Sequence, residues 1–155
     1  MAVLLDSGIV YAYYDRSDRW HGAAVELVRA EAGALMLPAP VVPEVDHLLG
    51  VRLGRAARRL FYRGLTEASF LLVELPQERV ARVAQIDEQF AELDLGFVDA
   101  AIVALAESTG VSRIATADRL HFEPLARAFG LELVPAPPAA KPAPASRSRR
   151  SKSRR

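Results

Sequence analysis

The chain has 155 residues, 51% of them hydrophobic, a length and composition typical of one domain with a sizeable core. It contains no cysteine, which excludes disulfide bonds, thiolate metal sites and cysteine nucleophiles, and its apolar runs are too short to span a membrane. Asp6 interrupts the N-terminal apolar run MAVLL and no basic region precedes it, so no signal peptide is indicated and we expect a soluble, cytoplasmic protein.

The net charge of +1 conceals an uneven distribution. Residues 141–155 carry seven basic residues and no acidic one, which leaves residues 1–140 with thirteen basic and all nineteen acidic residues, a net charge of −6. Both lysines lie in this last stretch, so every cation of the body is an arginine or a histidine. An acidic body with a cationic extension is not the composition of a simple DNA-binding domain.

The first half of the chain alternates short apolar runs with segments of helical spacing. The runs predict strands at residues 2–6, 34–38 and 70–75. The segments between and after them predict helices at residues 8–15, 21–33, 41–50 and 54–66. Three prolines mark the entry to the helix at 41–50, where a missing backbone N–H is tolerated.

The second half continues the same alternation. Its predicted elements are a long amphipathic helix at 77–94, a helix at 98–108, a strand at 112–116, a short helix at 122–129 and a last strand at 131–134. Strands separated by helices favour a mainly parallel sheet that is covered on both faces. We therefore predict a three-layer α/β/α domain over residues 1–135.

Residues 136–155 are rich in proline, alanine, serine and arginine and lack hydrophobic periodicity, which predicts a disordered basic tail. Two explanations of the tail stay open. It is either a solubilising or expression-derived extension, or a source of electrostatic affinity for a polyanion such as RNA.

Acidic residues from four separate segments are predicted to meet at one edge of the sheet. Ligands collect outside the carboxyl ends of parallel strands. Asp6 ends the first strand, and Asp118 follows the strand at 112–116. Asp99 lies in the first turn of the helix that leads to that strand, and Glu44 lies near the start of the helix after residues 34–38.

Each of these acids also has an ordinary structural explanation when taken alone. Asp6 could cap a helix or form a turn, and Asp118 could be a turn residue. Glu44 and Asp99 could be first-turn acids, which are favourable near a helix N-terminus. Asp94 is a fifth candidate, although capping the segment that follows it is the stronger interpretation.

Four carboxylates at one crevice repel one another unless a cation lies among them. Hard oxygen ligands suit Mg²⁺ or Mn²⁺, which bind proteins through a few carboxylates together with water and substrate phosphate. Such a site could activate water and stabilise the leaving oxygen in phosphodiester hydrolysis. The pattern therefore favours a metal-dependent nuclease.

Three segments together resemble the PIN domain, and more narrowly the VapC ribonuclease toxins of bacterial toxin–antitoxin pairs. They are LLDSGIVYAYYDRSDRWHGAA, PAPVVPEVDHLL and LGFVDAAIVALAESTGVSRIATADRLHF, the last of which contains the family-like run TADRLHF from Thr116 to Phe122. They carry the order Asp, Glu, Asp, Asp of the family, and the similarity spans roughly residues 2–135.

The resemblance implies that Asp6, Glu44, Asp99 and Asp118 bind Mg²⁺ or Mn²⁺ and are catalytic, with Ser7 and Thr116 as supporting hydroxyls. It also implies cleavage of single-stranded or looped RNA, neutralisation by a cognate VapB-type antitoxin, and a homodimer. The basic tail is atypical of the family.

Other residues have both an ordinary and a functional interpretation. Arg55, Arg59 and Arg63 share one helix face, which is either solvated or a contact surface for RNA phosphate or the antitoxin. His121 lies three residues after Asp118 and either touches substrate or is structural. The aromatic side chains near Asp6 either stack on a base or pack in the core; they are Tyr11, Tyr13 and Tyr14.

Two alternatives to an endoribonuclease toxin stay open from the sequence. One is a catalytically silent PIN-like module that binds RNA or protein, although such a module has no need for four like charges. The other is an RNA-maturation nuclease without an antitoxin. A phosphoaspartate enzyme is excluded because Gly8 stands where a second aspartate is needed, and because residues 1–140 contain no lysine.

Overall fold

The computed structural model describes residues 1–139; the predicted tail lies outside the described residues from Ala140 onward. Its five strands are β1 (Val3–Leu5), β2 (Leu35–Pro38), β3 (Leu71–Val73), β4 (Arg113–Ala115) and β5 (Glu132–Val134). Its seven α-helices are α1 (Ser7–Tyr14), α2 (His21–Ala30), α3 (Val41–Arg52), α4 (Arg55–Thr66), α5 (Val80–Gln89), α6 (Gly96–Thr109) and α7 (Arg119–Phe129).

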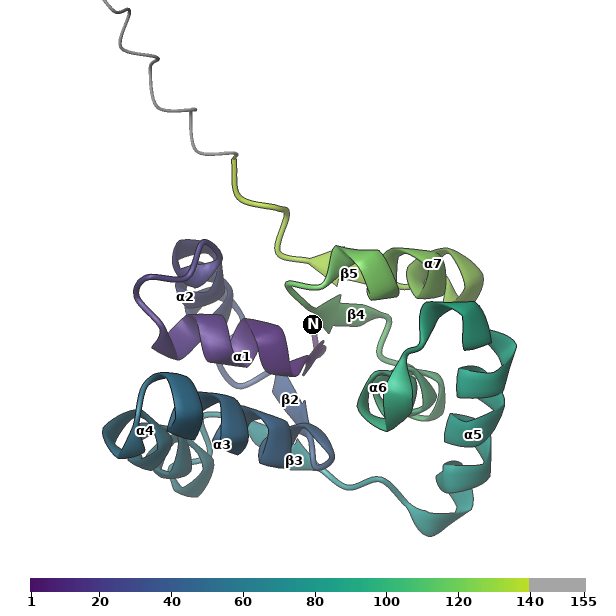
Figure 1. The fold of residues 1–155 in the computed structure, drawn as a ribbon, viewed down its shortest axis with the longest axis horizontal. Helices are drawn as coiled ribbons and strands as arrows, with labels where there is room; N and C mark the ends of the chain where they lie inside the picture. The colour runs from purple at the N-terminus through teal and green to yellow at the C-terminus, as the bar shows by residue number, and fades with distance from the viewer. Residues whose placement is uncertain (140–155) are drawn as a thin grey trace, which may run out of the picture.

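The strands form one parallel sheet in the order β3-β2-β1-β4-β5. Crossovers between parallel strands are right-handed, so the connections toward β3 and those toward β5 fall on opposite faces. Accordingly α1 to α4 cover one face, and α5 to α7 cover the other (Figure 1). The predicted three-layer α/β/α fold is confirmed.

The core is densest where α6 packs against the centre of the sheet. Every residue of β1 is buried, and so are seven consecutive residues of α6, from Ala100 to Ala106. A helix that is apolar all round is stable only when it is covered on all sides. Asp99 lies in the first turn of α6, immediately before this buried run.

Three of the predicted helices differ from the structure by three residues or more, and one of them, expected at 21–33, ends at Ala30. The helix expected at 77–94 is divided into a 3₁₀ turn, η1 (Gln77–Arg79), the helix α5, and a second turn, η2 (Ala91–Leu93). The chain leaves η2 through Asp94, whose φ of 50° is left-handed and cannot continue a helix. Helix α7 begins three residues earlier than expected, because the Asp118 side chain caps it.

Within residues 1–139, none of the helices combines the length and the apolar character needed to cross a membrane.

Candidate functional site

The carboxyl edge of the sheet brings Asp6 and Asp118 together. Asp6 directly follows β1 and is the N-cap of α1, while Asp118 lies three residues after the end of β4 and is the N-cap of α7. Because β1 and β4 are neighbouring parallel strands, both caps lie at the same edge. The capping interpretation and the ligand interpretation are therefore compatible in this structure.

Thr116 links the two aspartates. Its hydroxyl donates to Oδ2 of Asp6 at 2.8 Å and accepts the backbone N–H of Asp118 at 2.9 Å. Thr116 is fully buried and Asp6 is 4% exposed. The other carboxylate oxygen of Asp6 accepts the backbone N–H of Ser7 at 2.6 Å, and the Ser7 hydroxyl lies 3.3 Å from it. Both hydroxyls predicted as supporting residues thus contact Asp6.

His121 lies between Asp99 and Asp118. Its Nδ1 is 2.9 Å from Oδ2 of Asp118 and 3.7 Å from Oδ2 of Asp99. Its backbone N–H also donates to Oδ1 of Asp118 at 3.1 Å, so both oxygens of this carboxylate contact one residue. The sequence places His121 three residues after Asp118, but it predicted neither this contact nor the approach to Asp99.

Glu44 affects the other acids through its charge, not through a hydrogen bond. It lies in the first turn of α3, as expected, and is exposed. Its charge nevertheless raises the pKa of Asp6 and of Asp99. The structure therefore places all four predicted acids at one edge, with three in a connected network and Glu44 at the rim.

Burial and the charges of neighbouring carboxylates disfavour the ionised forms of the two inner acids, Asp6 and Asp99. Burial is the larger cause for Asp6 and, with the charges of Glu44 and Asp118, raises its pKa to about 6 against the lowering effect of the Thr116 and Ser7 hydrogen bonds. For Asp99, burial followed by the charges of Asp6, Asp118 and Glu44 raises the pKa to about 7. A nearby cation would reverse these shifts.

The donor set fits a hard divalent cation in its chemistry. Within residues 1–139, no three acidic or histidine side chains are already arranged as a tight ligand set. Carboxylate oxygens are nevertheless the ligands that Mg²⁺ and Mn²⁺ prefer, and a few of them suffice when water and phosphate complete the coordination. Glu44 is exposed, whereas hydrogen bonds from Ser7 and Thr116 hold both carboxylate oxygens of Asp6.

Comparison with known proteins identifies the family. The model that describes the PIN domain matches residues 3–127. The chain belongs to the PIN domain family. Ribonuclease VapC26 of Mycobacterium tuberculosis is 30% identical over 123 residues, which are 79% of this chain and 91% of that protein. The predicted family is thereby confirmed.

Solved structures share the fold of this PIN domain. The crystal structure of Mycobacterium tuberculosis VapC20, described as a toxin that cleaves the sarcin–ricin loop, superposes with a TM-score of 0.71 at 19% identity, covering 79% of this chain and 95% of that one. FitAcB from Neisseria gonorrhoeae superposes with a TM-score of 0.60 at 18% identity, covering 84% and 95%. At these identities the likeness concerns the fold.

Asp94 does not join the acids of the PIN domain. It is exposed at the left-handed end of η2, and its charge is not among those that shift Asp6 or Asp99. Its structural interpretation, a turn residue before α6, is the one that the structure supports.

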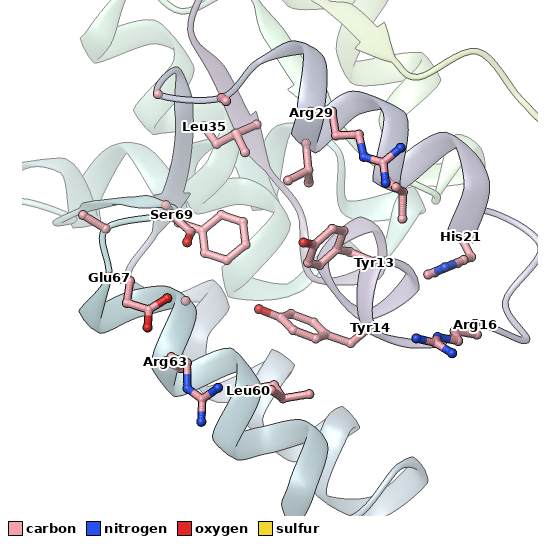
Figure 2. Close-up of a pocket in the computed structure, with 17 residues that line it drawn as sticks. Tyr13, Tyr14, Arg16, His21, Arg29, Leu35, Leu60, Arg63, Glu67 and Ser69 are labelled. Carbon is pink, nitrogen blue, oxygen red and sulfur yellow. The ribbon is translucent and has the colours of Figure 1, made fainter.

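A second surface, which the sequence did not reveal as a site, is a groove of about 750 Å³ between α1, α2 and α4 (Figure 2). It reaches the amino ends of β2 and β3, the edge opposite to the acids. Tyr13 and Tyr14 line it, together with the cationic side chains of Arg16, Arg29 and Arg63.

The arginine face of α4 is therefore only partly involved in this groove. Arg55, Arg59 and Arg63 are all exposed, as expected for a shared face, and Arg63 is the member that lines the groove. Tyr11 is buried instead, and its hydroxyl donates to Asp15 at 2.6 Å. Core packing is thus the correct interpretation for Tyr11.

Proposed function

We propose that this PIN domain is a divalent-metal-dependent endoribonuclease toxin of the VapC type, which cleaves single-stranded or looped RNA. The observation that carries the proposal is the group of carboxylates at the carboxyl edge. Burial and the charges of neighbouring carboxylates raise the pKa of Asp6 to about 6 and the pKa of Asp99 to about 7. A fold keeps such a costly arrangement where a cation and a phosphate are to be bound. The identity with a ribonuclease over most of the chain supports the same conclusion.

Asp6, Glu44, Asp99 and Asp118 are the residues that would hold the ion, Mg²⁺ or Mn²⁺. When bound, the ion supplies an activated water and charge stabilisation for the scissile phosphate. Asp6 is the fixed member, because Thr116 and Ser7 hold both of its oxygens. Burial and the charges of Asp6, Asp118 and Glu44 raise the pKa of Asp99 to about 7, so a nearby cation would favour its ionised form.

Other side chains orient these acids. The Thr116 hydroxyl aligns Asp6 and the loop of Asp118 at once, since it bonds to both. His121 orients the Asp118 carboxylate. Neither residue needs to act as a nucleophile or general base, since the attacking group in this proposal is water.

The proposed partners are RNA and a VapB-type antitoxin, with a homodimer as the assembly and the cytoplasm as the location. Arg55, Arg59 and Arg63 are the proposed contacts for RNA phosphate or antitoxin, and the groove beside Arg63 gives a protein segment room to bind. The proposed domain boundary stays at residue 135.

A catalytically silent binding module is the second candidate, and the fixed geometry of Asp6 speaks against it. An RNA-maturation nuclease without an antitoxin is the third, and the neighbouring genes distinguish it from a toxin.

The test of the proposed function is cleavage of a mixed structured RNA by purified protein with Mg²⁺, with Mn²⁺ and with EDTA. Cuts that disappear in EDTA support the proposal; folded protein that cuts under no condition contradicts it and favours the silent module.

A further inference from the structure

Arg119 occupies a position in α7 where an arginine is not favoured. It is the first residue of the helix and directly follows Asp118, the N-cap. The positive end of the helix dipole favours an acidic side chain there, and proline also fits the first position. An arginine opposes the dipole, so contacts with other parts of the fold have to offset this cost.

The guanidinium of Arg119 contacts two other segments. Its Cζ lies 5.6 Å from the centroid of the Trp20 ring, and its Nη2 donates to the carbonyl of Pro135. Trp20 directly precedes α2 and is only 6% exposed, so the arginine lies over a ring that is packed in the core. The Nε of Arg119 is buried without a hydrogen-bond partner among residues 1–139, so the ring and the carbonyl are the contacts that hold this side chain.

The α1–α2 loop, which carries Trp20, is itself fixed by two aspartates. Asp15 accepts the backbone N–H of Ser17 at 2.9 Å and the Ser17 hydroxyl at 2.7 Å. Asp18 accepts the backbone N–H of Trp20 at 2.7 Å. The loop follows α1, whose N-cap is Asp6. Hydrogen bonds of the helix and of the loop therefore connect Trp20 to the helix that Asp6 caps.

The amino end of α7 depends on contacts outside the core. The buried residues of this helix are Phe122 and Leu125, which lie at least one turn beyond the cap. The side chain of Asp118 is 42% exposed, and the Thr116 hydroxyl holds the backbone N–H of Asp118. Arg119 provides a second tie, which joins this end of α7 to the α1–α2 loop.

We propose that Arg119 is a positioning residue of the acidic site. By holding the amino end of α7 against Trp20, it sets the position of Asp118 relative to Asp6, the cap of α1. A cation shared by the two carboxylates requires both of them at fixed positions, and residues that orient metal ligands contribute about 10- to 100-fold to metal affinity. The inference rests on the proposed function, because it takes Asp118 as a ligand of the ion.

Two other roles for Arg119 have different consequences. A contact with RNA phosphate would affect RNA binding and its salt dependence, and would leave metal binding by the RNA-free protein unchanged. A purely structural contact would affect the melting temperature and neither of these affinities. Positioning of Asp118 is the role in which loss of Arg119 weakens metal binding before any RNA is present.

The experiment compares Arg119→Met with Arg19→Met in the full-length chain. Arg19 is the matched control, because its Cζ lies 5.7 Å from the centroid of the same Trp20 ring, whereas the residue is exposed and belongs to the α1–α2 loop. A third variant, Arg119→Lys, keeps the charge but loses the planar guanidinium. Calorimetry without RNA gives the Mn²⁺ affinity, cleavage of a labelled RNA gives kcat and KM, and thermal melting in EDTA checks folding.

We expect Arg119→Met to weaken Mn²⁺ binding by about tenfold or more. At one fixed Mn²⁺ concentration it should lower kcat and leave the KM for RNA unchanged. Arg119→Lys should restore part of the Mn²⁺ affinity, because an ammonium group can still donate to the Pro135 carbonyl. Arg19→Met should match the wild type in Mn²⁺ affinity and in kcat.

Unchanged Mn²⁺ affinity in folded Arg119→Met would overturn the proposal, and a raised KM beside it would assign Arg119 to RNA binding instead. Tighter Mn²⁺ binding would overturn it too, because the arginine would then only repel the ion, and so would equal losses in Arg119→Met and Arg19→Met. If Arg119→Met does not fold, Arg119→Lys decides, and Mn²⁺ affinity equal to that of the wild type refutes positioning. A wild type that binds no Mn²⁺ contradicts the proposed function as well, whereas failure in the variants alone contradicts only this inference.

Discussion

The hydroxyl of Thr116 donates a 2.8 Å hydrogen bond to Oδ2 of Asp6, although 110 residues separate the two in the chain. Both side chains are buried, and the contact joins the end of β1 to the end of β4. A buried carboxylate is costly to ionise unless donors face it. The bond therefore lowers the pKa of Asp6, against the rise that burial causes.

Replacing Thr116 with valine keeps the shape of the side chain and removes this donor. We expect the pKa of Asp6 to rise further, and divalent-metal affinity and RNA cleavage to fall by about 10- to 100-fold, as for partners that orient metal ligands. Thr116→Ser is the matched control, because it keeps the hydroxyl, and it should retain most of both. Equal loss in the two variants would mean that packing rather than the hydrogen bond matters.

The stability of the metal-free protein should depend on Asp99. Burial and neighbouring charges raise its pKa to about 7 in the folded chain from the ordinary 3.8 of an aspartate, so between these pH values the folded state binds more protons than the unfolded state. The contribution of Asp99 to the free energy of unfolding therefore falls as the pH rises through this window. Asp99→Asn removes the titration and should raise the free energy of unfolding at pH 8 by on the order of 2 to 4 kcal/mol.

Denaturant unfolding in EDTA at about pH 5 and pH 8 measures this effect. The wild type should lose more stability across the interval than the Asn variant does. If both proteins lose the same free energy of unfolding between about pH 5 and pH 8, the ionised form of Asp99 is not disfavoured in the folded state, and the repulsion that we infer is absent.

His121 should position Asp118 for metal binding. The 2.9 Å separation between Nδ1 of His121 and Oδ2 of Asp118 indicates that the ring donates an Nδ1–H hydrogen bond to this carboxylate. We expect His121→Ala to weaken Mn²⁺ binding by about tenfold or more in calorimetry. His121→Asn, whose amide can replace the Nδ1 donor, should weaken it less.

A rise in Mn²⁺ affinity on His121→Ala would also be informative. Tighter Mn²⁺ binding in the alanine variant would show that the ring competes with the cation for Asp99 and Asp118. A nitrogen NMR measurement of the tautomer in metal-free protein is an independent check, since the contact requires the proton on Nδ1.

Much of the fold was predictable because its elements repeat one pattern. Apolar runs such as residues 2–6 and 34–38 are buried parallel strands, and the apolar helix at 98–108 is the buried α6. The prediction of one long helix at 77–94 was wrong at its carboxyl end, because hydrophobic periodicity does not reveal the left-handed turn at Asp94. The early start of α7 depends on a side-chain cap at Asp118, whereas the sequence pattern indicated this residue only as a turn residue or a metal ligand.

The positions of the four acids followed from topology, since strand ends of a parallel sheet share one edge. The contacts among them did not follow. That His121 faces both Asp99 and Asp118 depends on how α6 and α7 pack, and the groove beside Tyr14 depends on how α1, α2 and α4 pack. Spacing within one segment carries no information about packing between segments.

The central claim is that the acids at the carboxyl edge form a metal-dependent ribonuclease site. Its most direct measurement compares Asp99→Asn with the matched variant Asp94→Asn, which removes the same charge five residues earlier at an exposed turn. Mn²⁺ titration and RNA cleavage are measured on the same preparations. We predict that Asp99→Asn loses both, whereas Asp94→Asn keeps both at wild-type level. Cleavage or Mn²⁺ binding that survives Asp99→Asn, or that falls equally in the two variants, would contradict the assignment of the site.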